Sequence, residues 1–342
     1  MGKRIEYIDA IRGFAILLVV MAHAIAWNYP DWHKICLFNQ TQPLNIMAGG
    51  VVWQVIYSFH MALFFMVSGY LSGNITINAQ NIYSRIKGKT IRLLLPYLTT
   101  GFFIYLVRGN WGYWFLLSLF EMSVLWIIMA MTLSLINPNK AFWKDILFIL
   151  CIYGLLRFLL LILPLSFRDI NFGAFIKYYL PFCFGVITKR HMIIEDIIRK
   201  PICFTICLIS FILLFITRYL TDYPLIYKVV EKADFFCSIL AILACTVVFH
   251  IFMKGILKKK EQFFAYIGKV SLPIYILHIV FVMQFSSVGL YILQQNVVTS
   301  ITFQIVYSIL LTIVAITCSI MLYKFLCYSK IIRLFFFGEK IE

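Results

Sequence analysis

The residues of this chain that could do chemistry are ionisable side chains inside strongly apolar stretches. Arg12 and His23 lie eleven positions apart in the first such stretch, and at about 100° per residue eleven steps return to nearly the same helix face. A cation in hydrocarbon costs at least ~2.5 kcal/mol, so such groups mostly face a protein interior or a water-filled cavity. The pair therefore indicates a functional site on the first helix.

The bulk composition predicts the elements that position these groups. Of the 342 residues, 63% are hydrophobic and 13% are charged, whereas soluble domains contain roughly 25% charged residues. Apolar runs long enough to cross ~30 Å of hydrocarbon recur along the whole chain. We therefore expect an all-α polytopic membrane protein of about ten transmembrane helices, forming a single membrane domain over residues 1–342.

Hydrophobic runs and basic residues together predict the topology. The expected spans are 8–28, 48–73, 91–108, 111–136, 141–164, 172–189, 201–220, 232–253, 265–288 and 299–327. Most of the 30 Lys and Arg residues lie in segments on the side of the N-terminus. Because cytoplasmic loops are enriched in these residues, both termini are expected to be cytoplasmic.

Charge and cysteine content exclude several classes of partner. The net charge of +16 is explained by loops that face an anionic lipid surface, and no basic stretch is interleaved with aromatic residues as nucleic-acid binding would require. The nine cysteines have no spacing that argues for a zinc site, so no metal is expected. Ala22-His23-Ala24 imitates a signal-peptide cleavage site, but Glu6, Asp9 and Arg12 interrupt the apolar core and favour a retained helix.

The predicted topology assigns a depth to each embedded polar residue. At a rise of about 1.5 Å per residue, one layer about 20 to 22 Å from the cytoplasmic ends contains His23, His60, Glu121 and His278. Asp9 and Arg12 lie only about 2 to 6 Å up the first span. These two polar stations suggest that a cytoplasmic anionic donor docks near Arg12 and delivers a group to the layer around His23.

Each of these residues also has a purely structural interpretation. Asp9 and Arg12 are three positions apart and could simply pair at a helix end. His60 could be a core histidine bonded to a backbone carbonyl. Glu121 must be neutralised or paired at its depth. Arg157, also deep in its span, is either a partner for Glu121 or a substrate ligand.

Five fragments, in order along nearly the whole chain, carry a resemblance to a known family. They are Tyr7-Ile-Asp9-Ala-Ile-Arg12-Gly13 followed by His23, Phe59-His60-Met-Ala-Leu-Phe64-Phe65-Met-Val-Ser68-Gly69-Tyr70, Arg92-Leu-Leu-Leu-Pro96-Tyr97, Trp114-Phe115-Leu116-Leu-Ser-Leu-Phe-Glu121, and Gly268-Lys-Val-Ser271-Leu-Pro273-Ile-Tyr275-Ile-Leu-His278. With them the chain resembles the integral-membrane acyltransferase family 3. The resemblance implies transfer of an acyl group, usually acetyl, to hydroxyls of surface carbohydrates, and Arg12 and His23 map onto the signature residues of the family.

Acyl transfer from a thioester to a sugar hydroxyl needs a base for the hydroxyl proton and a donor for the developing oxyanion. We expect His23 to be that base, or a transient acyl carrier, with Glu121 or His60 orienting it. The resemblance implies acetyl-CoA, or another acyl-CoA, as donor. Its phosphates would meet basic residues. The expected donor-binding residues are Arg12, Arg85, Lys89 and Arg92, and the expected substrate-binding residues are Asp9, Ser68, Tyr275, His278 and Arg157.

Two other classes of function fit part of this pattern. A transporter or flippase of a lipid-linked sugar or small anion would use the same charges as a path, although the two halves show no convincing internal repeat. A structural member of a polysaccharide-export complex would leave the histidines and Glu121 unexplained. The expected partners are acyl-CoA, a surface carbohydrate or lipid-linked glycan, membrane lipid and, in one arrangement, a second copy of the chain. The expected location is the bacterial cytoplasmic membrane, with outer loops 32–45, 167–172 and 219–227 shaping acceptor choice.

Overall fold

The computed structural model describes residues 6–29, 44–73, 79–109, 112–162, 172–219 and 234–339. Its described residues are helical or lie in turns and short connections, without a strand. They form two compact units. Unit 1 comprises Met1–Val67 and Asp196–Tyr323, and unit 2 comprises Ser68–Glu195 and Lys324–Glu342. The prediction of an all-α polytopic membrane protein is confirmed, while the number of ten transmembrane helices, the single domain over 1–342 and the cytoplasmic termini stay predictions.

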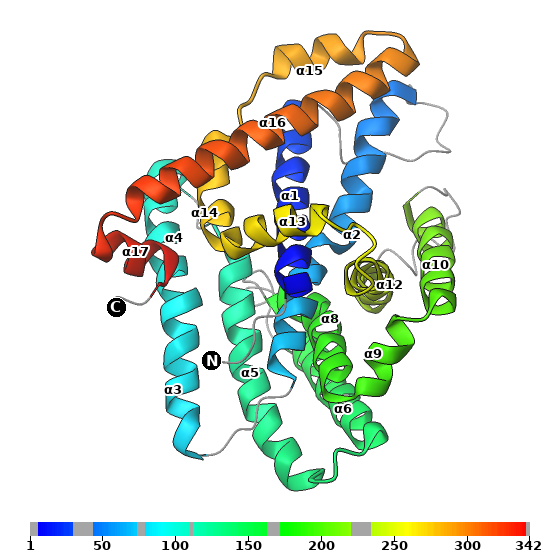
Figure 1. Ribbon diagram of the computed structural model, residues 1–342, viewed down its shortest axis with the longest axis vertical. Helices are drawn as coiled ribbons and strands as arrows, with labels where there is room; N and C mark the ends of the chain where they lie inside the picture. The colour runs from blue at the N-terminus through cyan, green and yellow to red at the C-terminus, as the bar shows by residue number, and fades with distance from the viewer. Residues whose placement is uncertain are drawn as a thin grey trace. The chain divides into compact units, whose positions relative to one another are not determined.

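Helices occupy each of the ten ranges that the sequence predicts (Figure 1). Unit 1 contains α1 (Glu6–Asn28), α10 (Pro201–Tyr219), α12 (Asp234–Met253), α13 (Lys260–Lys269), α14 (Ser271–Phe281) and α15 (Ser286–Leu293). Unit 2 contains α3 (Ala79–Lys89), the π-helical turn η1 (Thr90–Leu94), α4 (Leu95–Arg108), α5 (Trp114–Ile136), α6 (Phe142–Ile162), α8 (Phe172–Arg190) and α17 (Lys330–Phe337). Residues of α2 (Leu44–Ser72), α9 (Met192–Ile198) and α16 (Val297–Leu326) belong to both units.

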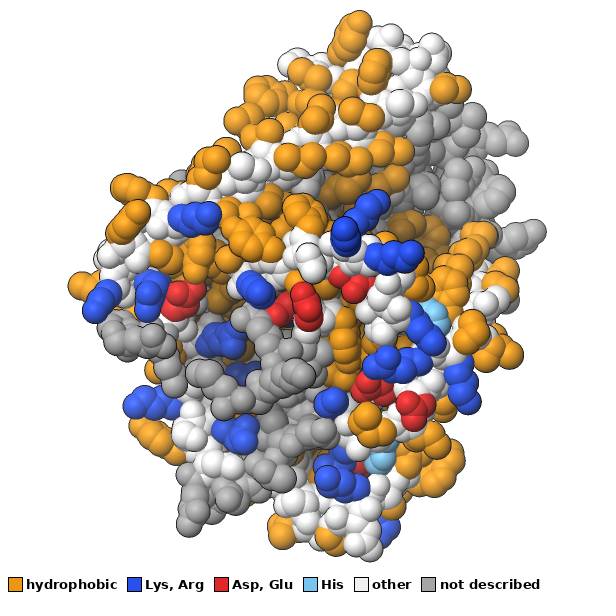
Figure 2. All heavy atoms as spheres, in the orientation of Figure 1, with side chains coloured by type: hydrophobic (Ala, Val, Ile, Leu, Met, Phe, Trp, Pro, Cys, Tyr) orange, Lys and Arg blue, Asp and Glu red, His pale blue; other side chains and the backbone are white. Residues whose placement is uncertain are grey.

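Five helical segments of the described residues are long and apolar enough to cross a membrane, and the number rises to seven if each of two bent helix pairs is one span. The segment Thr302–Leu326 of α16 illustrates why a bilayer is needed. Its surface includes Phe303, Leu310 and Met321, each at least half exposed. Figure 2 shows that hydrophobic side chains cover much of the surface over α15 and α16. Apolar side chains at such positions are explained by contact with lipid.

The predicted span 265–288 is not one continuous helix. Helix α13 ends at Lys269, α14 starts at Ser271, and the two are bent by 81°. Pro273 explains the bend, because a proline inside a continuous helix would lack its hydrogen bond to the carbonyl of Lys269 and its ring would clash there. In α14 the same proline falls in the first turn, where a missing N–H is tolerated. A helix-period pattern continues through this break, which is why the sequence alone did not show it.

A second proline explains the start of the predicted span 91–108. The chain is helical from Ala79 to Arg108, with η1 between α3 and α4. Within η1 the N–H of Leu95 bonds to the carbonyl of Thr90, five residues earlier. Pro96 follows and cannot donate to the carbonyl four residues before it, so a wider turn at this point avoids the clash. Helix α3 lies outside the ten expected spans because its sequence is polar and basic.

The core of unit 1 depends on a backbone contact between α1 and α13, which cross each other (Figure 1). A Cβ atom on Gly13 would overlap the carbonyl of Phe264, and one on Gly268 would overlap the carbonyl of Asp9. The rings of Phe14 and Phe264 pack beside this crossing, 6.0 Å apart. Small residues let helices approach this closely in membranes, where packing contacts replace the hydrophobic effect between helices.

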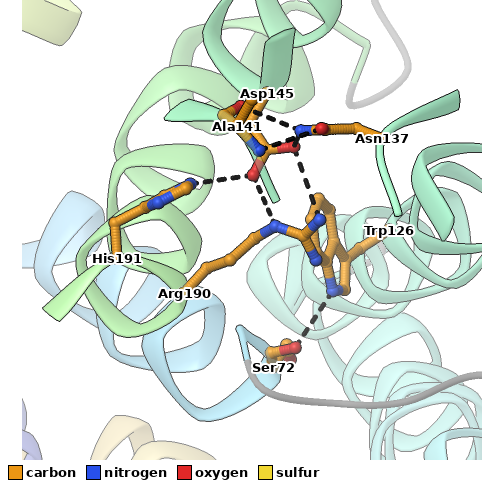
Figure 3. A network of polar contacts seen from close by, with 7 residues as sticks. All are labelled: Ser72, Trp126, Asn137, Ala141, Asp145, Arg190 and His191. Atoms are coloured by element: carbon orange, nitrogen blue, oxygen red, sulfur yellow. Dashed lines mark hydrogen bonds and ion pairs between the residues drawn. The ribbon is translucent and has the colours of Figure 1, made fainter. Parts of the chain in front are cut away.

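A buried carboxylate joins the helices of unit 2 (Figure 3). Asp145 on α6 is fully buried. It accepts hydrogen bonds from Nδ2 of Asn137 at 2.8 Å, from Nε of Arg190 and from Nε2 of His191 at 2.8 Å. Asn137 also closes the turn before α6, because its Oδ1 accepts from the N–H of Ala141 at 2.9 Å. A buried charge is tolerated only with such pairing, so the network ties α6 to the end of α8.

The α1–α13 crossing gives a prediction about stability. Changing Gly268 to Ala places a methyl group against the Asp9 carbonyl, and overpacking of this kind costs about 1 to 3 kcal/mol of unfolding free energy. Thermal unfolding of the full chain in lipid or detergent should show a clear fall in Tm. The matched control is Gly154→Ala on α6, where a Cβ meets nothing within 4 Å. Equal effects of the two substitutions would contradict the tight crossing.

Candidate active site

Two histidines of unit 1 lie in direct contact. His23 comes from α1 and His278 from α14, with ring centroids 5.0 Å apart. Nδ1 of His23 lies 3.0 Å from the carbonyl oxygen of Val19, and Nδ1 of His278 lies 3.1 Å from that of Ile274. Nε2 of His278 lies 3.3 Å from Nδ1 of His23. Of the four groups that the sequence placed in one layer, the structure brings these two together.

The backbone carbonyls determine which ring nitrogen carries hydrogen. A carbonyl oxygen can only accept, so Nδ1 of each ring must hold the hydrogen when the ring is neutral. Nε2 of His278 then has a lone pair and accepts from Nδ1 of His23, which shares its hydrogen with Val19. Nε2 of His23 is left as an unprotonated nitrogen, and no hydrogen bond reaches it from the described residues. That atom has the electronic form of a general base or a nucleophile.

The surroundings of the pair are apolar and aromatic. His278 is fully buried, whereas His23 is partly exposed. Trp27, one turn along α1, packs on His23 with centroids 5.5 Å apart. Tyr275, a predicted substrate-binding residue, is buried and lies 6.0 Å from the ring of His278. Of the two rings, the partly exposed one is therefore His23, whose Nε2 lone pair accepts no hydrogen bond from the described residues.

Arg12 contacts the helix that carries His278. Its Nη2 donates to Oγ of Ser271 at 2.9 Å, and its Nη1 lies 3.6 Å from Oδ1 of Asp9. Ser271 is the first residue of α14, so one short helix has Arg12 at its start and His278 near its end. The side chain of Arg12 is 20% exposed, against 7% for Asp9. Along α1, Arg12 and His23 are about 16 Å apart by helical rise.

His60 lies on α2 in unit 1. Its Nδ1 is 2.7 Å from the carbonyl oxygen of Ile56, and the side chain is buried. The ring meets Tyr57 edge-on at 4.9 Å. The backbone bond fits the structural interpretation of this histidine, and its catalytic role stays a prediction.

A predicted catalytic residue, Glu121, and two predicted substrate-binding residues, Ser68 and Arg157, lie in unit 2. Glu121 is partly buried on α5 and interacts electrostatically with Tyr97. Arg157 is partly buried on α6. Ser68 precedes Gly69, where a Cβ would overlap the carbonyl of Phe182. Gly69 therefore has a packing role between α2 and α8. The substrate-binding roles of Ser68 and Arg157 and the catalytic role of Glu121 stay predictions.

The predicted donor-binding cations of unit 2 form a cluster on consecutive turns. Arg85 and Lys89 lie on α3, and Arg92 lies in η1. Burial, with the nearby charges of Arg92 and Arg85, lowers the pKa of Lys89 to about 8. Arg92 is exposed, while Arg85 and Lys89 are partly buried. Like charges gathered at this density repel one another, and a bound polyanion would relieve that repulsion.

Two residues on the helices that carry the histidine pair were not predicted as part of the site. Ser271 was part of a recognised fragment but was not assigned to the site. Asn28, at the end of α1, donates from Nδ2 to the carbonyl of Met283 at 3.0 Å and accepts from the N–H of Phe285 at 2.8 Å. It therefore satisfies the backbone where α14 has ended and α15 has not begun. A polar residue at the last position of an apolar span was the available signal.

Two further predictions concern the outer loops and metal binding. Most of the outer loops 32–45, 167–172 and 219–227 lie outside the described residues. Within the described ranges, no group of three or more His, Cys, Asp or Glu side chains could hold a metal ion.

Comparison with known proteins agrees with the resemblance that the sequence fragments carry. A family described as an acyltransferase domain matches residues 5–324 of the 342-residue chain. No curated protein and no solved structure matches the chain. The family match covers α1 through most of α16, including the histidine pair, Arg12 and the cation cluster. The chain therefore belongs to the acyltransferase family 3 of integral-membrane proteins.

Proposed function

We propose that this membrane acyltransferase moves an acyl group, usually acetyl, from acyl-CoA to a hydroxyl of a cell-surface or lipid-linked carbohydrate. The observation that carries the proposal is the contact between His23 and His278, which leaves Nε2 of His23 with a lone pair. The proposed location is the bacterial cytoplasmic membrane, where a cytoplasmic donor and an outward-facing acceptor could both reach one protein.

The transfer step uses Nε2 of His23 as base. The sugar hydroxyl attacks the thioester carbonyl while Nε2 takes its proton, and a tetrahedral oxyanion forms. Collapse of this intermediate breaks the carbon–sulfur bond, and the imidazolium returns the proton to the CoA thiolate. A route through an acyl-histidine would use the same lone pair as the nucleophile.

His278 acts as a positioning residue in this scheme. When Nε2 of His23 takes a proton, the hydrogen on Nδ1 becomes a charge-assisted donor to Val19 and to Nε2 of His278. The imidazolium is therefore stabilised without any side chain moving. The hydrogen bond from Nδ1 of His278 to the carbonyl of Ile274 keeps the His278 ring oriented so that its Nε2 accepts from Nδ1 of His23.

The donor side of the proposal rests on cations. Arg12 is partly exposed, and its contacts with Asp9 and Ser271 fix the orientation of its guanidinium. Arg85, Lys89 and Arg92 supply a second group of positive charges. A CoA molecule carries several phosphates on a long, flexible thioester arm, so its charged end can bind at a distance from the reacting carbonyl. The relation between these cations and His23 is part of the proposal.

The broken pair α13–α14 is also a feature of transporters, whose interrupted helices bind ions. Membership of an acyltransferase family favours transfer chemistry over transport. The broken pair has its own explanation here, because it places Ser271 against Arg12 and His278 against His23.

The proposed role of His23 gives a prediction about catalysis. We expect His23→Ala to lower transfer of radiolabelled acetyl from acetyl-CoA to membrane glycan by about 10²- to 10⁴-fold, the usual contribution of a general base. Arg12→Ala should also lower labelling, by raising the KM for the donor. Membranes must contain matched amounts of each variant. His250→Ala is the matched control, since His250 is buried and its Nδ1 also contacts a backbone carbonyl. Full labelling by His23→Ala would contradict the assignment.

The proposed role of Lys89 gives a prediction about pH. Lys89 is charged below its pKa of about 8 and neutral above it, so affinity for an S-alkyl CoA thioether should fall about tenfold as pH rises from about 7 to about 9. This analogue has no thiol and does not react. Lys89→Arg should bind equally across this range, because arginine stays charged. The exposed Lys87 provides the control, and Lys87→Arg should show the same fall in affinity with rising pH as the wild-type chain. A fall that persists in Lys89→Arg would assign the titration to another group.

A further inference from the structure

Helix α17 (Lys330–Phe337) lies beyond residue 324, where the matched part of the family ends. Its N-terminus is capped by Ser329, whose side chain accepts from the N–H of Ile332. Polar residues Lys330 and Arg333 alternate with apolar ones at helical spacing, and Phe337 is buried. A short helix with one apolar face must be held by what it packs on. Here that surface is α4 and η1 of the same unit.

Three contacts fix α17 to this surface. The hydroxyl of Thr99 on α4 lies 2.6 Å from the carbonyl oxygen of Phe335, a carbonyl in the last turn of α17 that has no partner within the helix. The ring of Phe336 packs on Phe103 with centroids 5.4 Å apart. The third contact is made by Gly338, directly after the helix.

Gly338 touches the π-helical turn through its backbone. It ends α17 in the left-handed region, with φ of +62°, and its N–H bonds to the carbonyl of Leu334. A Cβ here would lie 2.5 Å from the carbonyl oxygen of Ile91 and 2.7 Å from Cα of Arg92. Only glycine fits both the conformation and the space. The peptide that it covers is the one that carries Arg92.

Gly338 contacts the chain at η1, where the regular α-helical hydrogen-bond pattern between α3 and α4 is interrupted. The five-residue bond of η1 is an irregular turn, and such turns are often found at functional sites. Lys89 lies immediately before η1 and Arg92 lies within it, so the shape of the turn sets the separation of the two cations. Electrostatic repulsion between these two cations would favour a larger separation between them. The contact of α17 and Gly338 with η1 would act as a brace against that separation.

We propose that α17 and Gly338 form a positioning element that holds Arg92 beside Lys89 through the π-helical turn, so that the two cations are preorganised for donor phosphates. This inference rests on the donor role proposed above. Gly338 and Thr99 touch no substrate in this scheme; they act through η1. Loss of the brace should therefore weaken binding of the donor and leave the step at His23 unchanged.

The test compares two glycines that end helices. Gly338→Ala should raise the KM for acyl-CoA and the Kd for the CoA thioether by about ten- to hundredfold, with kcat within about twofold of wild type. Gly109→Ala is the matched control. Gly109 ends α4 with φ of +70°, but a Cβ there meets nothing within 4 Å. It carries the same backbone strain without contact to η1 and should leave KM unchanged.

A second variant protects the test against misfolding of the first. Thr99→Val keeps the shape of the side chain and removes only the hydroxyl, which lies nearest to the carbonyl oxygen of Phe335, at 2.6 Å, and farther from those of Leu95 and Pro96 in its own helix. We expect a smaller rise in KM in the same direction, again with kcat retained. If Arg92→Ala weakens donor binding while Gly338→Ala and Thr99→Val bind as wild type does, the brace is overturned and the donor site stands.

Each remaining outcome also supports or overturns the positioning role of α17 and Gly338. A fall in kcat without a change in KM, or an equal loss in Gly338→Ala and Gly109→Ala, would show a general structural role and overturn the inference. If the wild-type chain does not bind the CoA thioether, the proposed donor is wrong, and the inference fails with it. Binding that is lost in Arg92→Ala and Gly338→Ala, but kept in Gly109→Ala, supports both proposals.

Discussion

The hydrogen bonds from Nδ1 of His23 and His278 to the carbonyls one turn before them determine what the site can do. Each bond fixes the neutral tautomer of its ring. The contact between the rings then engages the lone pair on Nε2 of His278 and leaves the lone pair on Nε2 of His23 without a hydrogen bond from the described residues. A polar group in the membrane interior has little water to satisfy it, so its partners must come from the protein. Here the helix backbone supplies them.

The other special residues of unit 1 make this contact possible. Gly13 and Gly268 let α1 and α13 meet backbone to backbone. Pro273 requires a new helix to begin after Lys269, and the bend of 81° directs α14 along a different axis. Asn28 satisfies the backbone where that helix has ended. These are structural roles, and each one contributes to placing His278 against His23.

The helices of this fold could be predicted from the sequence better than the points where one helix ends and the next begins. Apolar runs located helices in all ten expected ranges, because length and hydropathy dominate in a membrane. Depth counting placed His23 and His278 in one layer, and in the structure their rings lie in contact even though the helix between residues 265 and 288 is broken. The break was missed because periodicity does not register a single proline. Helix α3 was missed because its residues are polar and basic.

The partners of the polar residues were the hardest to predict. The bond between Arg12 and Ser271 joins residues 259 positions apart, and no local pattern indicates such a pair. The same holds for Gly338, whose contact with Ile91 becomes visible only when α17 is seen on η1. The chemical type of a side chain was enough to identify candidate site residues, whereas tertiary packing determines which residues they contact.

The state of the His23 ring is the most direct test of this account. Solid-state ¹⁵N NMR of the full chain in lipid bilayers, at a mildly alkaline pH where the ring is neutral, reports which nitrogen carries hydrogen. His23→Gln identifies the signals by their loss. The account predicts hydrogen on Nδ1 and a bare Nε2. Hydrogen on Nε2 would contradict it, because that nitrogen could then neither take the hydroxyl proton nor attack the thioester.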